Sequence, residues 1–303
     1  MPGLSNWVQW CLDLLPLPSW VAKAHQHPSL VGKVVLVTGA SSGIGRELAI
    51  QMVKQGMKVI LAARSTEKLV ELRNNLINSD KKGMTMFDPQ VLTLDLEDLE
   101  NLKDKAEEAL QIFGSIDILV NNGGISVRGE TIETQLSVHQ RLMNVNYFGS
   151  LELTRHVGSH MVTAGSGKIV LVSSVQGRLA TPYRTAYAAS KHALQAWADC
   201  MRAELSGDGV EVLVVSPGYV STDLSRNALT ASGSSYGQLD KTTEQGYSVQ
   251  YVAQQILEGI GKGKKELILA PLHVRLAIIL RVLLPGLYFY IMKRKALKEM
   301  KAK

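Results

Sequence analysis

The sequence predicts an α/β protein built on one doubly wound parallel sheet. The stretch 32–65, GKVVLVTGASSGIGRELAIQMVKQGMKVILAARS, reads as strand, glycine-rich turn, amphipathic helix and second strand. The apolar runs at 169–172 and 210–215 lack polar alternation, as expected of parallel strands covered on both faces. Strands and helices alternate without interruption over 32–271 of the 303 residues. We therefore expect a single domain at 32–271, flanked by apolar terminal segments at 1–31 and 272–303.

Composition narrows the classes of function. The net charge is +6, but the tail KRKALKEMKAK at 293–303 has six basic residues against one acid and so carries +5 of it. A basic surface for nucleic acid is therefore not expected. The two cysteines, Cys11 and Cys200, do not suggest a disulfide framework, and the scattered histidines suggest no metal site.

The glycine-rich turn predicts a phosphate site. Gly39, Gly43 and Gly45 precede and open the first helix, where absent side chains let backbone N–H groups and the positive helix end approach a pyrophosphate. Their spacing, G-x-x-x-G-x-G, differs from the familiar G-x-G-x-x-G fingerprint, and a ligand-free tight turn is the alternative. The same turn contains Ser41, Ser42 and Ile44.

The end of the second strand bears on which dinucleotide is bound. An acid there accepts hydrogen bonds from the ribose 2′-OH of NAD, but this chain has Ala63 followed by Arg64. A guanidinium can bind a 2′-phosphate that a carboxylate would repel. The sequence favours NADP(H); the alternative is that Arg64 is a solvated residue at a helix start.

Ionisable groups gather after the strand at 169–172. Ser173 and Ser174 follow that strand, and Tyr187 and Lys191 lie four apart in a helix with apolar residues at 193, 196, 197 and 200. A cation beside a phenol lowers its pKa and makes it a proton donor and acceptor. A half-buried tyrosine with a lysine beside it is the structural alternative.

Taken together, the turn and the Ser174, Tyr187 and Lys191 set resemble the short-chain dehydrogenase/reductase family, which has a Rossmann fold. The resemblance implies catalytic roles for Asn146, Ser174, Tyr187 and Lys191, with Ser174 and Tyr187 binding the substrate. Ser174 is preferred to Ser173 because it lies 13 residues before Tyr187. Asn146 would hold a water near the lysine, and Asn144 is expected to be an exposed helix residue.

The same resemblance implies a set of residues that bind the cofactor. Asp95 and Leu96 would meet the adenine, and the turn at 217–222 would cover the nicotinamide. The whole set is Gly39, Ser41, Ser42, Gly43, Ile44, Gly45, Arg64, Asp95, Leu96, Asn122, Tyr187, Lys191, Pro217, Gly218, Val220 and Thr222.

Over residues 33–295 the chain resembles the member 7B group of that family, through NYFG at 146–149, AYAASKHA at 186–193 and SPGY at 216–219. Members of that group are membrane-associated. We expect a membrane location here too, in the endoplasmic reticulum rather than the peroxisome. Family members commonly pair through the helices of Asn146 and Tyr187, which implies a homo-oligomer.

Both ends of the chain are apolar but interrupted. Residues 1–31 contain Pro16 and Pro18, and they either pack on the domain or lie at a membrane interface. Residues 272–292 contain Arg275, Arg281 and Pro285, which leave a helix of about three turns and a shorter apolar piece, too short to span a bilayer. We expect a monotopic anchor with snorkelling arginines and a tail on anionic headgroups; closure over the substrate site or packing on a partner subunit is the alternative.

The expected activity is NADP(H)-dependent reduction of a lipophilic carbonyl compound, such as a steroid, a retinoid or an acyl- or alkyl-chain ketone. The long loop at 223–247 is expected to form a substrate-binding flap. A membrane-bound enzyme meets such substrates at high local concentration. The alternative function is a membrane-associated dinucleotide-binding scaffold without catalysis.

Overall fold

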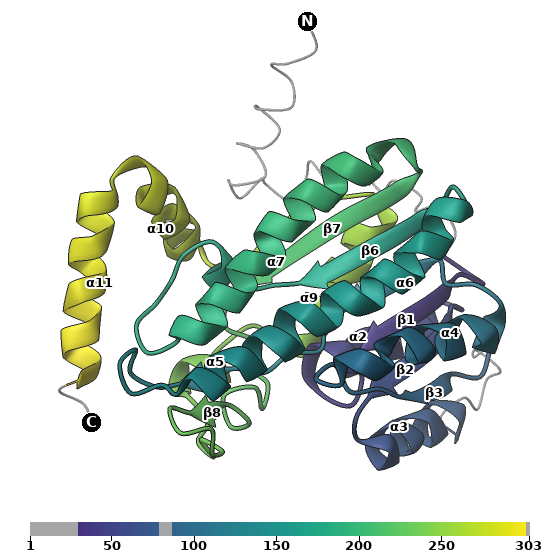
Figure 1. The fold of residues 1–303 in the computed structure, drawn as a ribbon, viewed down its shortest axis with the longest axis horizontal. Coiled ribbons are helices and arrows are strands. Elements are labelled where there is room, and N and C mark those ends of the chain that lie inside the picture. The colour runs from purple at the N-terminus through teal and green to yellow at the C-terminus, as the bar shows by residue number, and fades with distance from the viewer. Residues whose placement is uncertain (1–29, 79–86, 301–303) are drawn as a thin grey trace, which may run out of the picture.

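The computed structural model describes residues 30–78 and 87–300 (Figure 1). Most of the N-terminal segment predicted at 1–31 lies outside these residues. The chain from residue 30 begins directly before the first strand of the central sheet.

The central sheet has seven parallel strands, and it confirms the predicted doubly wound α/β fold. Their order is β3-β2-β1-β4-β6-β7-β9, so the direction of winding reverses between β1 and β4. In such sheets ligands bind off the carboxyl ends of the strands, at the point of reversal. The strands are β1 (Val34–Thr38), β2 (Lys58–Ala63), β3 (Gln90–Thr93), β4 (Ile118–Asn121), β6 (Gly167–Val172), β7 (Val210–Pro217) and β9 (Glu266–Leu269).

Helices cover both faces of this sheet, because successive side chains of each strand point to opposite sides. Val35 and Val37 of β1 enter one apolar cluster, with α2 (Gly43–Lys54), α3 (Thr66–Asn78) and α9 (Val249–Gly261). Val34 and Leu36 enter the other, with α4 (Leu102–Phe113), α6 (Gly149–Thr163) and α7 (Thr185–Glu204). Burial on both faces explains why the strand sequences are almost wholly apolar.

Shorter elements connect the main helices and strands. They are the 3-10 turns η2 (Leu99–Asn101), η4 (Val175–Gly177) and η5 (Leu205–Gly207), the helices α5 (Leu136–Met143) and α8 (Lys241–Glu244), the π-helix η3 (Asn144–Phe148), and the strands β5 (Val127–Arg128) and β8 (Leu229–Thr230). β5 and β8 form a separate parallel pair. The predicted flap at 223–247 therefore contains a strand and a short helix, and is not an irregular loop throughout.

Helix α7 is present as predicted. Its buried face runs through Tyr187, Lys191, Leu194, Gln195, Ala198 and Met201. Of the apolar residues that indicated the helix, Ala196 and Cys200 are exposed, and Ala193 and Trp197 are half-buried. The helix therefore turns two polar side chains, Lys191 and Gln195, inward.

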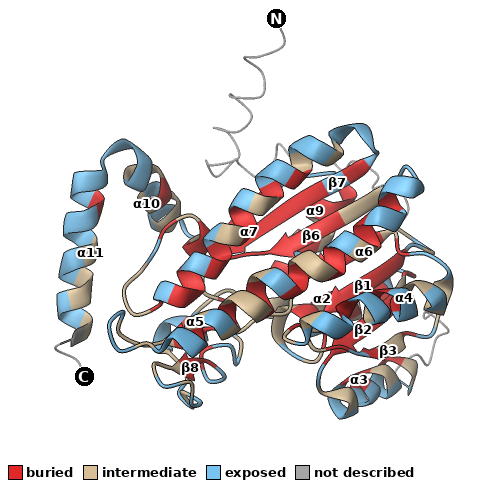
Figure 2. Cartoon of the chain, viewed as in Figure 1, coloured by how far each residue is buried: buried red, intermediate tan, exposed pale blue. Residues whose placement is uncertain are grey.

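The C-terminal segment forms two helices, α10 (Leu272–Leu283) and α11 (Pro285–Met300), drawn in yellow at one end of the molecule (Figure 1). The second is longer than predicted, because the basic tail continues it. Ile278 and Tyr288 are buried against Leu179, Ile268 and Ala270. Most of the remaining α11 surface is exposed (Figure 2).

The two arginines of this segment have partners within the protein. Arg275 donates hydrogen bonds to the carbonyl oxygens of Ala270 and Ile268, at the end of β9. The Arg281 guanidinium lies 5.7 Å and 5.0 Å from the ring centroids of Tyr288 and Phe289. The expectation that both arginines snorkel from lipid is therefore wrong for Arg275, which holds α10 to the sheet. Among the described residues, no helix is long and apolar enough to cross a membrane.

Candidate active site

A cavity of about 1140 Å³ opens at the carboxyl ends of the strands. It runs from the glycine-rich turn after β1, past Tyr187, to the apolar side chains of α10 and α11. Sixteen predicted residues line it, and two do not: Gly45 and Asn146. Those lining it are Gly39, Ser41, Ser42, Gly43, Ile44, Arg64, Asp95, Leu96, Asn122, Ser174, Tyr187, Lys191, Pro217, Gly218, Val220 and Thr222.

The backbone of the glycine-rich turn requires glycine. Gly39 has φ +66°, and a Cβ there would lie 2.8 Å from the Cα of Gly123. Gly43, which opens α2, has φ +55°. The N-cap residue Ser42 makes no side-chain capping hydrogen bond, so the first-turn amides are left to an anion approaching from the cavity. The turn thus fits a pyrophosphate.

Gly45 serves packing behind this turn. It is buried, and a Cβ there would collide with the carbonyl oxygen of Gly39 and the amide of Asn122. Its role is to let α2 approach β1 closely, which places the helix end under the turn.

Asn122 joins the turn after β4 to β1. Its side-chain amide donates to the carbonyl oxygen of Thr38 at 3.0 Å. In return, the Thr38 hydroxyl accepts from the backbone N–H groups of Asn122 and Gly123, at 3.0 Å each. A Cβ at Gly123 would lie 2.6 Å from Cδ1 of Leu96, so that leucine fills the space that an alanine methyl would need.

Cations lie at the end of β2, as predicted. Ala63 is the last residue of β2, and Arg64 follows it, exposed on the wall of the cavity. Lys68, one turn into α3, lines the same wall and was not singled out from the sequence. On the next strand, β3 ends at Thr93, two residues before Asp95, whose Oδ1 accepts a hydrogen bond from the N–H of Glu97.

Ser174, Tyr187 and Lys191 come together in the middle of the cavity, and all three are buried. The Lys191 ammonium donates to the carbonyl oxygen of Val172 at 2.9 Å, and its nitrogen lies 5.8 Å from the Tyr187 ring centroid. The Ser173 hydroxyl donates to the carbonyl oxygen of Lys191, and the Ser174 hydroxyl donates to that of Pro217 at 3.4 Å. Only Ser174 is also hydrogen-bonded to the Tyr187 phenol, which supports Ser174 as the hydroxyl that meets the substrate.

Burial dominates the titration of this pair. Burial raises the pKa of Tyr187, against partial lowering by its hydrogen bond with Ser174 and by the charges of Arg128 and Arg184. Burial also lowers the pKa of Lys191 to about 8. The expectation that Lys191 lowers the pKa of the phenol is not met, because burial outweighs the opposing effects and the cations that act on the phenol are the two arginines.

Asn146 is fully buried in the π-helix and positions its neighbours. Its amide donates to the carbonyl oxygen of Ile125 and to the Ser190 hydroxyl, and its oxygen accepts from the N–H of Ile125. Ser190 in turn donates to the carbonyl oxygen of Tyr187. Both amide hydrogens are therefore used within the protein, and a water relay through Asn146 stays a prediction. Asn144 is half-buried and not exposed as expected.

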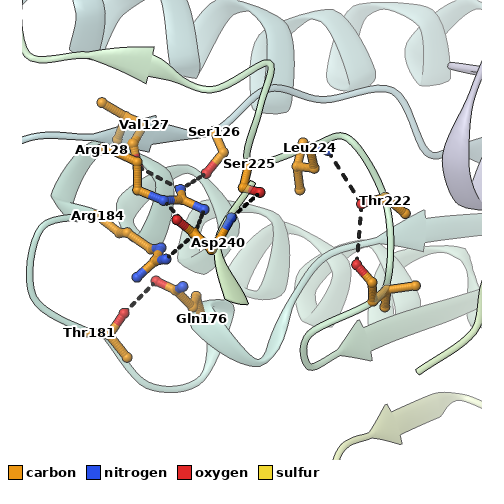
Figure 3. A network of polar contacts seen from close by, with 11 residues as sticks. Ser126, Val127, Arg128, Gln176, Thr181, Arg184, Thr222, Leu224, Ser225 and Asp240 are labelled. Atoms are coloured by element: carbon orange, nitrogen blue, oxygen red, sulfur yellow. Dashed lines mark hydrogen bonds and ion pairs between the residues drawn. The ribbon is translucent and has the colours of Figure 1, made fainter. Parts of the chain in front are cut away.

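Arg128 and Arg184, which the sequence analysis missed, line the cavity, and Figure 3 shows their network of polar contacts with Asp240. Asp240 Oδ2 accepts hydrogen bonds from Arg128 and from Arg184. Arg128 also donates to the Ser126 hydroxyl at 2.9 Å. The one local sign of this cluster in the sequence was Arg184, directly before α7. No pattern in the sequence indicates that Arg184 pairs with Asp240, which lies 56 positions later. Among the described residues, no cluster of three acidic, histidine or cysteine side chains could hold a metal.

Solved structures show the same fold. One of a short-chain dehydrogenase/reductase from Burkholderia phymatum in complex with NAD aligns with a TM-score of 0.72 at 23% identity, covering 84% of this chain and 94% of that one. Another, a gluconate 5-dehydrogenase from Burkholderia cenocepacia in complex with NADP and tartrate, aligns with a TM-score of 0.69 at 25% identity, covering 81% and 96%.

Sequence relatives identify the family. Dehydrogenase/reductase SDR family member 7B of Bos taurus is 46% identical over 293 residues, which cover 97% of this chain and 90% of the relative. The family model for short chain dehydrogenases matches residues 33–232. The chain therefore belongs to the short-chain dehydrogenase/reductase family of oxidoreductases.

Proposed function

We propose that this protein reduces a lipophilic carbonyl compound with NADPH. The observation that carries the proposal is the buried set of Ser174, Tyr187 and Lys191 in one cavity, between the phosphate-binding turn and the apolar wall of α10 and α11. The reduced nicotinamide ring, when bound, supplies the hydride that adds to the carbonyl carbon. The protein must supply orientation and a proton.

Tyr187 suits the role of proton donor. Because burial raises its pKa, the phenol is protonated at neutral pH and can give its proton to the carbonyl oxygen. Ser174 Oγ is placed to donate a hydrogen bond to the same oxygen as negative charge develops there. Lys191 is placed to hold the cofactor ribose from one turn further along α7. The protonated phenol favours reduction over alcohol oxidation, which would need a base.

Arg64 supports the choice of NADP(H). The relatives of known structure include one with NAD and one with NADP, so the fold accepts either dinucleotide. Here the end of β2 presents Arg64, with Lys68 on the same wall, and no carboxylate of β2 competes for the 2′-position. Two cations favour a phosphate there.

The apolar wall supports a lipophilic substrate. Leu276, Leu280 and Leu283 of α10 and Ile291 and Met292 of α11 line the cavity beyond Tyr187. A steroid, a retinoid or a long-chain ketone would bury its apolar body here and place its carbonyl at the phenol. We therefore assign the C-terminal helices a part in the substrate site. The sequence analysis gave closure over that site as the alternative to a membrane anchor.

The outer surface of the same helices supports binding to a membrane. Val282, Leu287, Phe289 and Tyr290 are between 48% and 74% exposed. Apolar side chains beside a basic tail are typical of an interfacial segment on anionic lipid. We place the protein on the endoplasmic reticulum rather than the peroxisome.

A homo-oligomer is proposed through the outward faces of η3 with α6 and of α7. Phe148 is 41% exposed, and Tyr147 packs edge-on against both Phe148 and Trp197, which gives this face an aromatic character. Ala196→Arg on the same face should give a monomer by light scattering, and an unchanged mass would place the interface elsewhere.

The decisive experiment compares the protein with its Tyr187→Phe variant. The variant should lose turnover by about a thousandfold or more, because the carbonyl oxygen loses its proton donor. Its NADPH affinity should stay nearly unchanged. A near-normal rate would refute the assignment. Failure of the unaltered protein to oxidise NADPH with any of a graded panel of ketones and aldehydes, despite tight binding, would favour the non-catalytic scaffold.

A further inference from the structure

Asp240 links three segments that are distant in the sequence. Its Oδ2 lies 2.9 Å from Nε and 2.6 Å from Nη2 of Arg128, and 2.9 Å from Nη2 of Arg184. Arg128 belongs to β5, Arg184 is the N-cap residue of α7, and Asp240 is the N-cap residue of α8. The three side chains are only 9% to 16% exposed. Buried charges of this kind are costly unless they are paired, so the arrangement depends on all three members.

We propose that Asp240 is a positioning residue of the reaction. Asp240 accepts hydrogen bonds from Arg128 and Arg184 at one carboxylate oxygen and so holds the two guanidinium groups in the cavity that contains the Tyr187 phenol. The net positive charge of this cluster then determines how readily the phenol loses its proton. This inference rests on the proposed role of Tyr187 as the proton donor.

The two arginines of the cluster share a cavity with the Tyr187 phenol. Tyr187 shares a buried apolar cluster with Val127 and Leu229, which are paired with each other across β5 and β8. Arg128 directly follows Val127, and Arg184 lies three residues before Tyr187 at the start of the same helix. Arg128, Arg184 and Tyr187 all line the cavity.

The cluster carries a net positive charge. Two guanidinium groups share one carboxylate, and proton donation by Tyr187 leaves a phenolate that this charge stabilises. Both arginines lower the pKa of Tyr187, in opposition to its burial. Asp240 offsets half of their charge and so limits the effect. Other titratable groups that line the cavity are Lys191 on α7, Tyr219 and Asp223 after β7, His273 on α10 and Lys295 on α11. The ring of Tyr236 faces Arg128, with its centroid 5.9 Å from the guanidinium carbon.

The test is a titration of the Tyr187 phenol itself. The ionisation of tyrosine is followed by near-ultraviolet absorption, and the curve of the matching Tyr187→Phe protein is subtracted so that only Tyr187 remains. This is done for the unaltered protein, Asp240→Asn, Arg184→Met and Asp240→Glu. Glu133→Gln is the control, because it removes an exposed carboxylate that does not line the cavity.

The two main variants should shift the titration in opposite directions. Asp240→Asn adds a net positive charge beside the phenol and should lower its pKa by about one unit, whereas Arg184→Met should raise it by a similar amount. Asp240→Glu should restore most of the original value, and Glu133→Gln should leave it unchanged. Equal shifts in one direction, or none, would overturn the proposal. Circular dichroism and NADPH affinity identify a variant that has failed to fold. If Asp240→Asn fails in this way, the pKa of Tyr187 in Asp240→Glu decides whether the carboxylate at this position sets the titration.

Because the titration needs no turnover, it is separate from the test of the reaction. Shifts of the expected sign in a protein that reduces no carbonyl would leave the cluster as assigned and refute the proposed function. Conversely, an active enzyme whose phenol ignores Asp240→Asn and Arg184→Met would keep its function and refute the role of Asp240.

Discussion

The ammonium of Lys191 donates a hydrogen bond to the carbonyl oxygen of Val172, the last residue of β6, at 2.9 Å. This bond is made in a fully buried place, and burial lowers the pKa of Lys191 from 10.5 to about 8. The charge of Lys191 is therefore kept at an energetic cost to the folded protein.

That cost should be visible as a dependence of stability on pH. Above about pH 8 the folded protein releases the Lys191 proton, while the unfolded chain keeps it up to about pH 10.5. The unfolded state then binds more protons, so the free energy of unfolding rises with pH in this window. The Lys191→Met variant has no ammonium at this position, so its free energy of unfolding lacks this contribution. The stability of the unaltered protein relative to Lys191→Met should rise by about 1 to 2 kcal/mol between about pH 7.5 and 9.5, measured by urea denaturation. A constant difference would show that the buried ammonium keeps its proton.

Arg64 should determine the preference between the two dinucleotides. Arg64→Ala combined with Ala63→Asp replaces an attractive charge with a repulsive one at the end of β2. NADPH affinity should fall by about 10- to 100-fold while NADH affinity rises, as measured by fluorescence titration of each cofactor. The affinities of Lys68→Ala for the two cofactors, measured in the same way, show how much the second cation on that wall contributes. If the double variant keeps its NADPH affinity, Arg64 does not bind the 2′-phosphate.

Gly39 should tolerate no side chain. At φ +66°, and with a Cβ position 2.8 Å from the Cα of Gly123, Gly39→Ala must shift the backbone of two turns. We expect a loss of about 1 to 3 kcal/mol in stability and a fall in dinucleotide affinity. Gly207→Ala is the matched control, because a Cβ there meets nothing within 4 Å. Equal behaviour of the two variants would show that the turn is less restrictive than its geometry indicates.

The exposed face of the C-terminal helices should govern membrane binding. Deletion of 272–303 is a poor test, because Ile278 and Tyr288 are buried and their loss would expose the end of the sheet. Val282→Ser with Leu287→Ser changes only side chains that are exposed and do not line the cavity. Binding to vesicles containing anionic lipid should weaken at least about tenfold.

Ile132→Ser with Leu136→Ser is the control for this double substitution, because both residues are exposed and neither belongs to α10 or α11. Sedimentation with vesicles measures both proteins. Equal binding by the two variants would move the membrane contact away from α10 and α11, and would leave residues 1–31 as the remaining candidate.

Much of the site was predictable because its requirements are local. Gly39 and Gly43 are needed for the backbone of one turn, Ala63 and Arg64 mark the end of one strand, and Tyr187 and Lys191 are one helical turn apart. Such features depend on residues close in the sequence, and so they can be read without knowing what packs around them.

Burial and long-range pairing were decided only by the tertiary structure. Arg128 and Asp240 are 112 positions apart, and no periodicity relates them. The direction of the pKa shift of Tyr187 was inferred from its neighbour Lys191, yet it depends on desolvation by β5 and β8, which pack on it from elsewhere in the chain. Likewise, α7 buries Lys191 and Gln195 in place of the apolar stripe at 193, 196, 197 and 200. The sequence alone determined which groups are candidates for the chemistry. Their solvation and their partners were decided by the assembly of the sheet, because desolvation and Coulomb interactions depend on distance in space.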